Sequence, residues 1–141
     1  MIDIENKVQD EIFNALTTAF PGIAVYGEAV EKSATFPAAT VWETDNRPYR
    51  QSETEQSTEN NAVVTYEINA YSDLQSGAKL QAKAIIAEAD RVMQSLGFRR
   101  LLRRRVANLD RTIYRMYARY EAVVSQPYVD GDNTVYKINR R

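Results

Sequence analysis

The chain has 141 residues, contains neither cysteine nor histidine, and carries a formal net charge of −1 at pH 7. Without cysteine it has no disulfide, thiol nucleophile or zinc–thiolate site, and without histidine it lacks the commonest general base and metal ligand. A hydrophobic fraction of 44% and a charged fraction of 26% are ordinary for a soluble globular chain, and the length predicts a single domain over residues 1–141.

The first predicted element is an amphipathic helix close to the N-terminus. Its apolar residues recur at helical spacing and form one stripe. The stripe consists of Ile4, Val8, Ile12, Leu16 and either Ala19 or Phe20. The Pro-Gly pair at 21–22 predicts where this helix ends.

Two short strands are predicted next, at residues 23–27 (IAVYG) and 35–45 (TFPAATVWETD). The following stretch, 46–61, is almost free of apolar residues and rich in Gln, Ser, Thr, Glu and Asn. It predicts a long polar loop inside the domain, because the residues after it could not form a core alone.

Residues 62–72 alternate between apolar and polar types, as a half-buried strand does. Ser72 and Gln75 have the spacing of a capping box, which predicts that a second helix begins there. An apolar, alanine-rich stripe continues to Leu96, and Gly97 is suited to the residue that ends the helix.

The last third predicts antiparallel strands at residues 98–109 and 112–124. In the second of them, alternation places Tyr114 and Tyr120 on a core face. Asp130-Gly131 predicts a hairpin turn, with residues 134–138 as the returning strand. The resulting order, α-β-β-loop-β-α-β-β-β, indicates an α+β fold in which two helices pack on an antiparallel or mixed sheet.

Charge is distributed very unevenly along the chain. Residues 1–90 carry 15 acidic and 6 basic side chains, for a net charge of −9, whereas residues 91–141 carry 4 acidic and 12 basic, for a net charge of +8. Such asymmetry indicates either a polyanionic partner for the basic part or complementary surfaces that meet between subunits.

The basic part is densest at residues 99–105, RRLLRRR. Strict alternation would place Leu101 on the same face as Arg99, and Leu102 on the same face as Arg100. Three interpretations are open: a solvated edge strand that resists aggregation, a contact with the acidic part of a neighbouring copy, or a phosphate contact with passing DNA. Arginine suits the second, because guanidinium pairs with carboxylates in a bidentate manner.

The order of motifs from about residue 4 to residue 125 resembles the tail-completion proteins of long-tailed bacteriophages, especially the tail terminators. The resemblance begins with the amphipathic helix and Phe36-Pro37, which runs into ATVWE. After the polar loop come INAYSD, then Leu96-Gly97-Phe98, and lastly the stretch from Asp110 to Arg115 that leads into MYARYEAVV.

The resemblance implies a structural protein of the virion, assembled in the host cytoplasm, with no enzymatic activity. Its subunits would form a ring, usually a hexamer, that caps the tail tube protein and joins it to the head–tail connector protein. The alternatives are a head–tail joining protein of the neck, or a nucleic-acid-binding module that uses the same arginines.

No apolar run in the sequence approaches the roughly 18 residues of a membrane span.

Two groups of residues are the candidate functional residues, and no catalytic, cofactor-binding or metal-binding residue is predicted. The candidates for a ring interface or lumen are Arg99, Arg100, Arg103, Arg104, Arg105, Arg115 and Arg119. The candidates for a docking loop are Arg47, Arg50, Glu53, Glu55 and Glu59.

Overall fold

A computed structural model describes most of the chain. The described residues are 1–28, 35–49, 61–108, 110–126, 128–131, 133–135 and 137–139. In chain order the elements are α1 (Glu5–Ala19), β1 (Ala24–Tyr26), β2 (Ala38–Pro48), β3 (Asn61–Ser72), α2 (Ala78–Leu96), β4 (Arg99–Val106), β5 (Tyr114–Ser125), β6 (Tyr128–Asp130), β7 (Asn133–Val135) and β8 (Ile138–Asn139).

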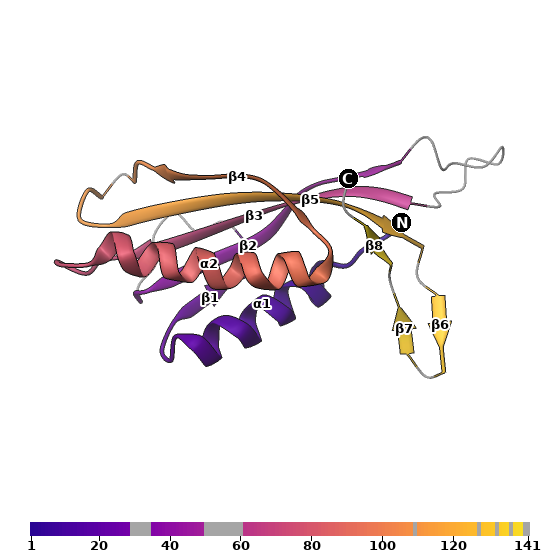
Figure 1. The fold of residues 1–141 in the computed structure, drawn as a ribbon, viewed down its shortest axis with the longest axis horizontal. Helices are drawn as coiled ribbons and strands as arrows, with labels where there is room; N and C mark the ends of the chain where they lie inside the picture. The colour runs from indigo at the N-terminus through magenta and orange to yellow at the C-terminus, as the bar shows by residue number, and fades with distance from the viewer. Residues whose placement is uncertain are drawn as a thin grey trace.

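The fold is α+β, with a mixed open sheet covered on one side by two helices (Figure 1). The strand order is β1-β2-β3-β5-β4, and β8 pairs with the part of β5 that β4 leaves unpaired. Only β1 and β2 are parallel within this sheet; the other pairs are antiparallel. We call the covered side the helix face and the opposite side the open face.

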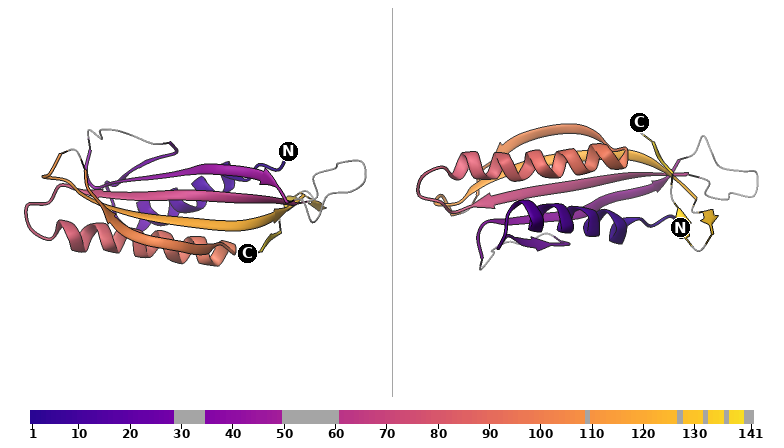
Figure 2. Two further views of the ribbon diagram at one scale, coloured as in Figure 1. Left: turned by 90° about the horizontal axis from the view of Figure 1, so that it is seen from above. Right: turned by 60° about the horizontal axis from the view of Figure 1, so that its bottom comes forward.

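The helices lie side by side, each over a different part of the sheet (Figure 2). α1 packs against β1 and β2, at one margin, while α2 packs against β3, β5 and β4, toward the other. No described element covers the open face. The sheet therefore has a β1 edge flanked by α1 and a β4 edge flanked by α2.

The core fills the space between the helices and the helix face. The predicted stripe of α1 is confirmed, since Val8, Ile12 and Leu16 are fully buried. Phe98 packs edge-on against the Tyr66 ring, with centroids 5.3 Å apart. The predicted core face of β5 is confirmed as well, because Tyr120 is fully buried in the same cluster.

The predicted start of the second helix is wrong. β3 continues through Ser72, whose hydroxyl donates a hydrogen bond to the Gln81 side chain instead of capping a helix at 72. α2 begins only after Gly77, which adopts a left-handed conformation with φ 86°. Its predicted end is confirmed: Gly97 has φ 102°, and a Cβ there would lie 2.8 Å from the Ile138 carbonyl oxygen.

The polar loop is shorter at its start than predicted. β2 extends to Pro48 and pairs with β3 to its beginning, so residues 46–48 belong to a strand. Residues 50–60 lie outside the described part of the chain.

The strand predicted at 134–138 is divided between two elements. β7 pairs with β6 around Gly131, which confirms the predicted hairpin, whereas β8 returns to the main sheet beside β5. The backbone N–H of Ser125 donates to the Lys137 carbonyl oxygen at 2.8 Å, which joins the two ends of the segment that carries β6 and β7.

A carboxyl group on the helix face makes stability depend on pH. Burial raises the pKa of Glu43, although hydrogen bonds donated by Asn46 and Tyr66 partly oppose that rise. A raised pKa favours the protonated form in the folded state, so this stabilisation is present at low pH and is lost as pH rises through the folded pKa. Glu43→Gln should therefore gain unfolding free energy relative to the wild type as pH is raised from about 4 to 7, measured by urea denaturation. A difference that stays constant over this range would contradict the prediction.

Candidate functional site

The arginine-rich segment forms the outermost strand of the sheet. β4 pairs with β5 on one side only, which confirms the prediction of an edge strand. All five of its arginines are exposed. We call these residues the basic edge: Arg99, Arg100, Arg103, Arg104 and Arg105.

A β-bulge corrects the predicted alternation of β4. The register with β5 shifts between Arg100 and Leu102, so Leu101 lies opposite no residue of β5. The shift changes which side chains share a face. The arginines opposite core residues of β5 are Arg100, Arg103 and Arg105, and those opposite open-face residues are Arg99 and Arg104.

One arginine of the basic edge is held by the body of the protein. The Arg100 guanidinium forms an ion pair with Asp90 of α2, with Nη1 and Oδ1 3.0 Å apart. The same carboxylate oxygen accepts a 2.7 Å hydrogen bond from the Tyr120 hydroxyl. Arg100 therefore joins β4 to α2 and is less available for a partner than its neighbours.

Two other arginines of the basic edge lie over tyrosine rings of β5. The guanidinium carbon of Arg104 is 5.8 Å from the centre of the Tyr117 ring, and that of Arg105 is 4.8 Å from the centre of the Tyr114 ring. A ring face attracts a cation, so these contacts hold both guanidinium groups near β5. Guanidinium groups of this kind are suited to pairing with carboxylates.

Arg115 and Arg119 belong to the open face and not to the edge. Arg115 donates from Nε to Asn69 Oδ1 at 2.8 Å and lies over the Tyr71 ring at 5.6 Å. Arg119 is half-buried between Glu67 and Leu102 on the neighbouring strands. Both side chains are therefore part of a packed layer, whereas the arginines of the basic edge are exposed.

Carboxylates alternate with the cations across the open face. Burial raises the pKa of Tyr117, and a hydrogen bond to Glu67 acts in the same direction. Glu121 forms an ion pair with Arg47 of β2 at 3.5 Å, and Arg47 also pairs with Asp45. The open face thus carries acidic and basic side chains close together, some of them already paired with one another.

The opposite edge of the sheet carries acidic side chains. α1 runs along β1, and exposed carboxylates occur before α1, on it and just after β1. We call these residues the acidic margin: Asp3, Asp10 and Glu28. Glu11 is also exposed, but it faces the space between α1 and α2. Lys7 is the one cation of α1. The two edges of one sheet thus differ in the sign of their charge.

A small hollow lies in the acidic margin between α1 and β1. Its volume is about 190 Å³, and it is lined by Gln9, Asp10, Phe13, Val25, Tyr26, Gly27 and Val41. The Gln9 amide closes its floor by donating to the carbonyl oxygens of Gly27 (2.8 Å) and Val41 (3.2 Å). Phe13 forms one wall and is 49% exposed, which is unusual for an aromatic ring.

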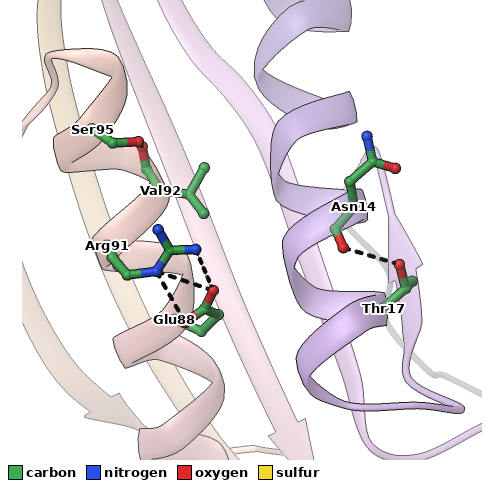
Figure 3. Close-up of polar contacts among 6 residues, drawn as sticks. All are labelled: Asn14, Thr17, Glu88, Arg91, Val92 and Ser95. Carbon is green, nitrogen blue, oxygen red and sulfur yellow. Dashed lines mark hydrogen bonds and ion pairs between the residues drawn. The ribbon is translucent and has the colours of Figure 1, made fainter.

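A larger groove of about 390 Å³ lies between α1 and α2 (Figure 3). Its polar groups bond mostly within their own helix. Arg91 pairs with Glu88 at 2.6 Å, and the Ser95 hydroxyl donates to the Val92 carbonyl oxygen at 2.7 Å. Across the groove, the Thr17 hydroxyl donates to the Asn14 carbonyl oxygen. The polar residues Glu11, Asn14 and Thr18 also line the groove, on the side of α1.

Two further kinds of site would be a cluster of metal ligands or a membrane-spanning helix among the described residues. No cluster of three or more Asp or Glu side chains there has the arrangement of a metal site. Neither α1 nor α2 has the length and apolar character needed to cross a membrane.

The structure thus divides the residues predicted from sequence. It brings the arginines of β4 together at one edge and moves Arg47 from the predicted docking loop into β2. The remaining loop candidates, Arg50, Glu53, Glu55 and Glu59, lie outside the described residues. The hollow was not predicted from the sequence. One signal was available: Phe13 is a large apolar residue that lies next to Ile12 in sequence and therefore outside the buried stripe of α1.

No protein-family model matches the sequence, and no curated protein matches it either.

Proposed function

We propose that this protein is a structural, non-enzymatic subunit that assembles into a closed ring, of the kind that terminates a bacteriophage tail. The observation that carries the proposal is the opposite charge of the two sheet edges, with the basic edge on β4 and the acidic margin along α1 and β1. In a ring, each subunit uses two different surfaces, one for each neighbour. Surfaces of opposite sign on opposite sides of one molecule meet this requirement.

The chemistry of the basic edge supports a contact with carboxylates. Arg104 and Arg105 are already oriented by tyrosine rings, which lowers the entropy lost when they bind. Exposed ion pairs are individually weak and are screened by salt. A row of them at one interface therefore predicts assembly that is strong at low ionic strength and weak at high ionic strength.

The phage role rests on the order of motifs along the chain. In that role a hexameric ring would sit on the last ring of the tail tube protein, stop further addition and present its other side to the head–tail connector protein. No cofactor is required, because surface complementarity performs the whole task. Neighbouring genes test this assignment: a tail-tube or tape-measure gene supports the terminator, and a portal-side gene supports a head–tail joining protein.

A charge exchange between the two edges tests the ring directly. One variant, Arg103→Glu with Arg104→Glu and Arg105→Glu, leaves two arginines against three glutamates on β4 and so gives the protein two acidic edges; the other, Asp3→Lys with Asp10→Lys and Glu28→Lys, gives it two basic edges. Each should remain monomeric by light scattering, because like edges repel. An equimolar mixture should assemble again, since the two variants can alternate around a ring with an even number of subunits.

The matched control is Lys79→Glu with Lys83→Glu and Arg91→Glu, which makes the same change in net charge as the first variant but on α2. It should assemble as the wild type does. A wild-type protein that stays monomeric at low salt and high concentration would contradict the ring. Salt-sensitive DNA binding by such a monomer, lost on mutation of the basic edge, would assign it to the nucleic-acid-binding alternative.

A further inference from the structure

We propose that Leu101 of one subunit inserts into the hollow beside Phe13 of the next subunit, as the apolar anchor of the ring contact. The inference rests on the ring proposed above and specifies which side chains meet in it. Protein interfaces usually combine a small apolar centre with a charged rim, and a few buried anchors supply most of the affinity. Charge alone would leave this interface without such a centre.

The inserting group is placed by the bulge in β4. Leu101 has no partner residue on β5 and is 39% exposed, although it is a large apolar side chain. Bulges in edge strands commonly redirect a side chain. Here the redirected side chain is a leucine that directly follows Arg100 and is separated from Arg103 by Leu102.

The receiving hollow has a matching character. Phe13 and Val25 supply apolar wall, and the Gln9 amide, which already donates to two backbone carbonyl groups, closes the floor. A Cβ at Gly27 would lie 2.9 Å from that amide, so glycine is what lets Gln9 occupy this position. The floor is therefore held in place before any partner arrives.

The charges around the two surfaces are complementary. Leu101 is surrounded by the basic edge, whereas the hollow is bordered by Asp10 and lies close to Glu28 at the end of β1. The two surfaces also lie at opposite edges of the same sheet, as a head-to-tail contact requires. The occupant that these observations indicate is a second copy of this chain.

Engineered thiols test the contact, because the protein has no cysteine of its own. Two single-site variants, Leu101→Cys and Phe13→Cys, are mixed at low salt and oxidised, and the products are counted by non-reducing mass spectrometry. We expect more of the disulfide that joins one variant to the other than of either disulfide that joins two copies of the same variant. The matched control is Leu80→Cys mixed with Phe13→Cys, because Leu80 is 74% exposed on α2 and belongs neither to the basic edge nor to the hollow.

Affinity gives a second measurement. Leu101→Ala and Phe13→Ala should each raise the concentration needed for assembly about tenfold or more. The double variant should raise that concentration by less than the product of the two single effects, because both changes remove the same contact. Leu80→Ala should leave that concentration unchanged. Both replaced side chains are partly exposed, so the variants are expected to fold.

The outcomes separate this inference from the ring itself. Suppose that the charge-exchanged mixture assembles, but the Leu101→Cys and Phe13→Cys mixture gives no more mixed disulfide than the Leu80→Cys control. The anchor would then be refuted and the ring would stand. If reversing the edges leaves assembly unchanged, the ring proposal itself fails.

Discussion

Replacing Phe98 by alanine is expected to lower the free energy of unfolding by about 3–5 kcal/mol. Phe98 is fully buried, and its ring meets the Tyr66 ring at an interplanar angle of 84°. It also directly follows Gly97, where the chain turns from α2 into β4, and its backbone N–H donates to the Met93 carbonyl oxygen. The neighbouring backbone is therefore fixed on both sides, which limits how far the site can collapse around the missing ring.

Urea denaturation measures this loss at neutral pH, under salt conditions that keep the protein monomeric. Phe98→Leu is the matched control, since it retains most of the apolar volume and should lose clearly less. A loss below about 1 kcal/mol for Phe98→Ala would show that the ring does not pack in the core as described.

Asp90→Ala is expected to have the second largest effect, a loss of about 1–3 kcal/mol. The main cause is the Tyr120 hydroxyl, which loses the acceptor that it contacts at 2.7 Å while its side chain stays fully buried. The lost ion pair to Arg100 contributes less, because the Arg100 side chain is 43% exposed and water screens the pair.

Two companion variants separate these causes. Asp90→Asn keeps an oxygen acceptor for Tyr120 and should lose less than Asp90→Ala. The double variant Asp90→Ala with Tyr120→Phe should be less destabilised than the sum of its single changes, because it leaves no orphaned hydroxyl. Additive losses would show that the hydroxyl and the carboxylate are not coupled.

Local patterns predicted much of this fold. The apolar stripe of α1, the core face of β5 and the glycine that ends α2 follow from side-chain periodicity and from the backbone freedom of Gly97. Each depends on residues that are close in sequence, so the sequence carries the relevant information directly.

The errors occur where tertiary contacts override local patterns. Ser72 matches a capping box, but its hydrogen bond to the Gln81 side chain and the pairing of β3 with β5 keep it in a strand. The bulge at Leu101 depends on the register with β5, which lies further along the chain. Strict alternation could not reveal it.

In the candidate site, too, some features could be predicted from local sequence and others depend on tertiary structure. Uneven charge was visible in the sequence, but its separation onto two edges depends on the strand order, which places β5 between β3 and β4. Phe13 could be recognised from the sequence as an apolar residue outside the buried stripe of α1, but that alone did not indicate a hollow. Its position beside β1 follows only from the packing of the helix on the sheet.

The guanidinium row on β4 has a further consequence for how copies of the protein can associate. An outermost strand normally offers its free backbone groups to an identical strand of another molecule, which gives symmetric pairs or aggregates. Here such a pairing would place ten positive side chains, five from each copy, along one seam. Mutual repulsion disfavours that product, so in the proposed ring each molecule would join in the same orientation as the one before it.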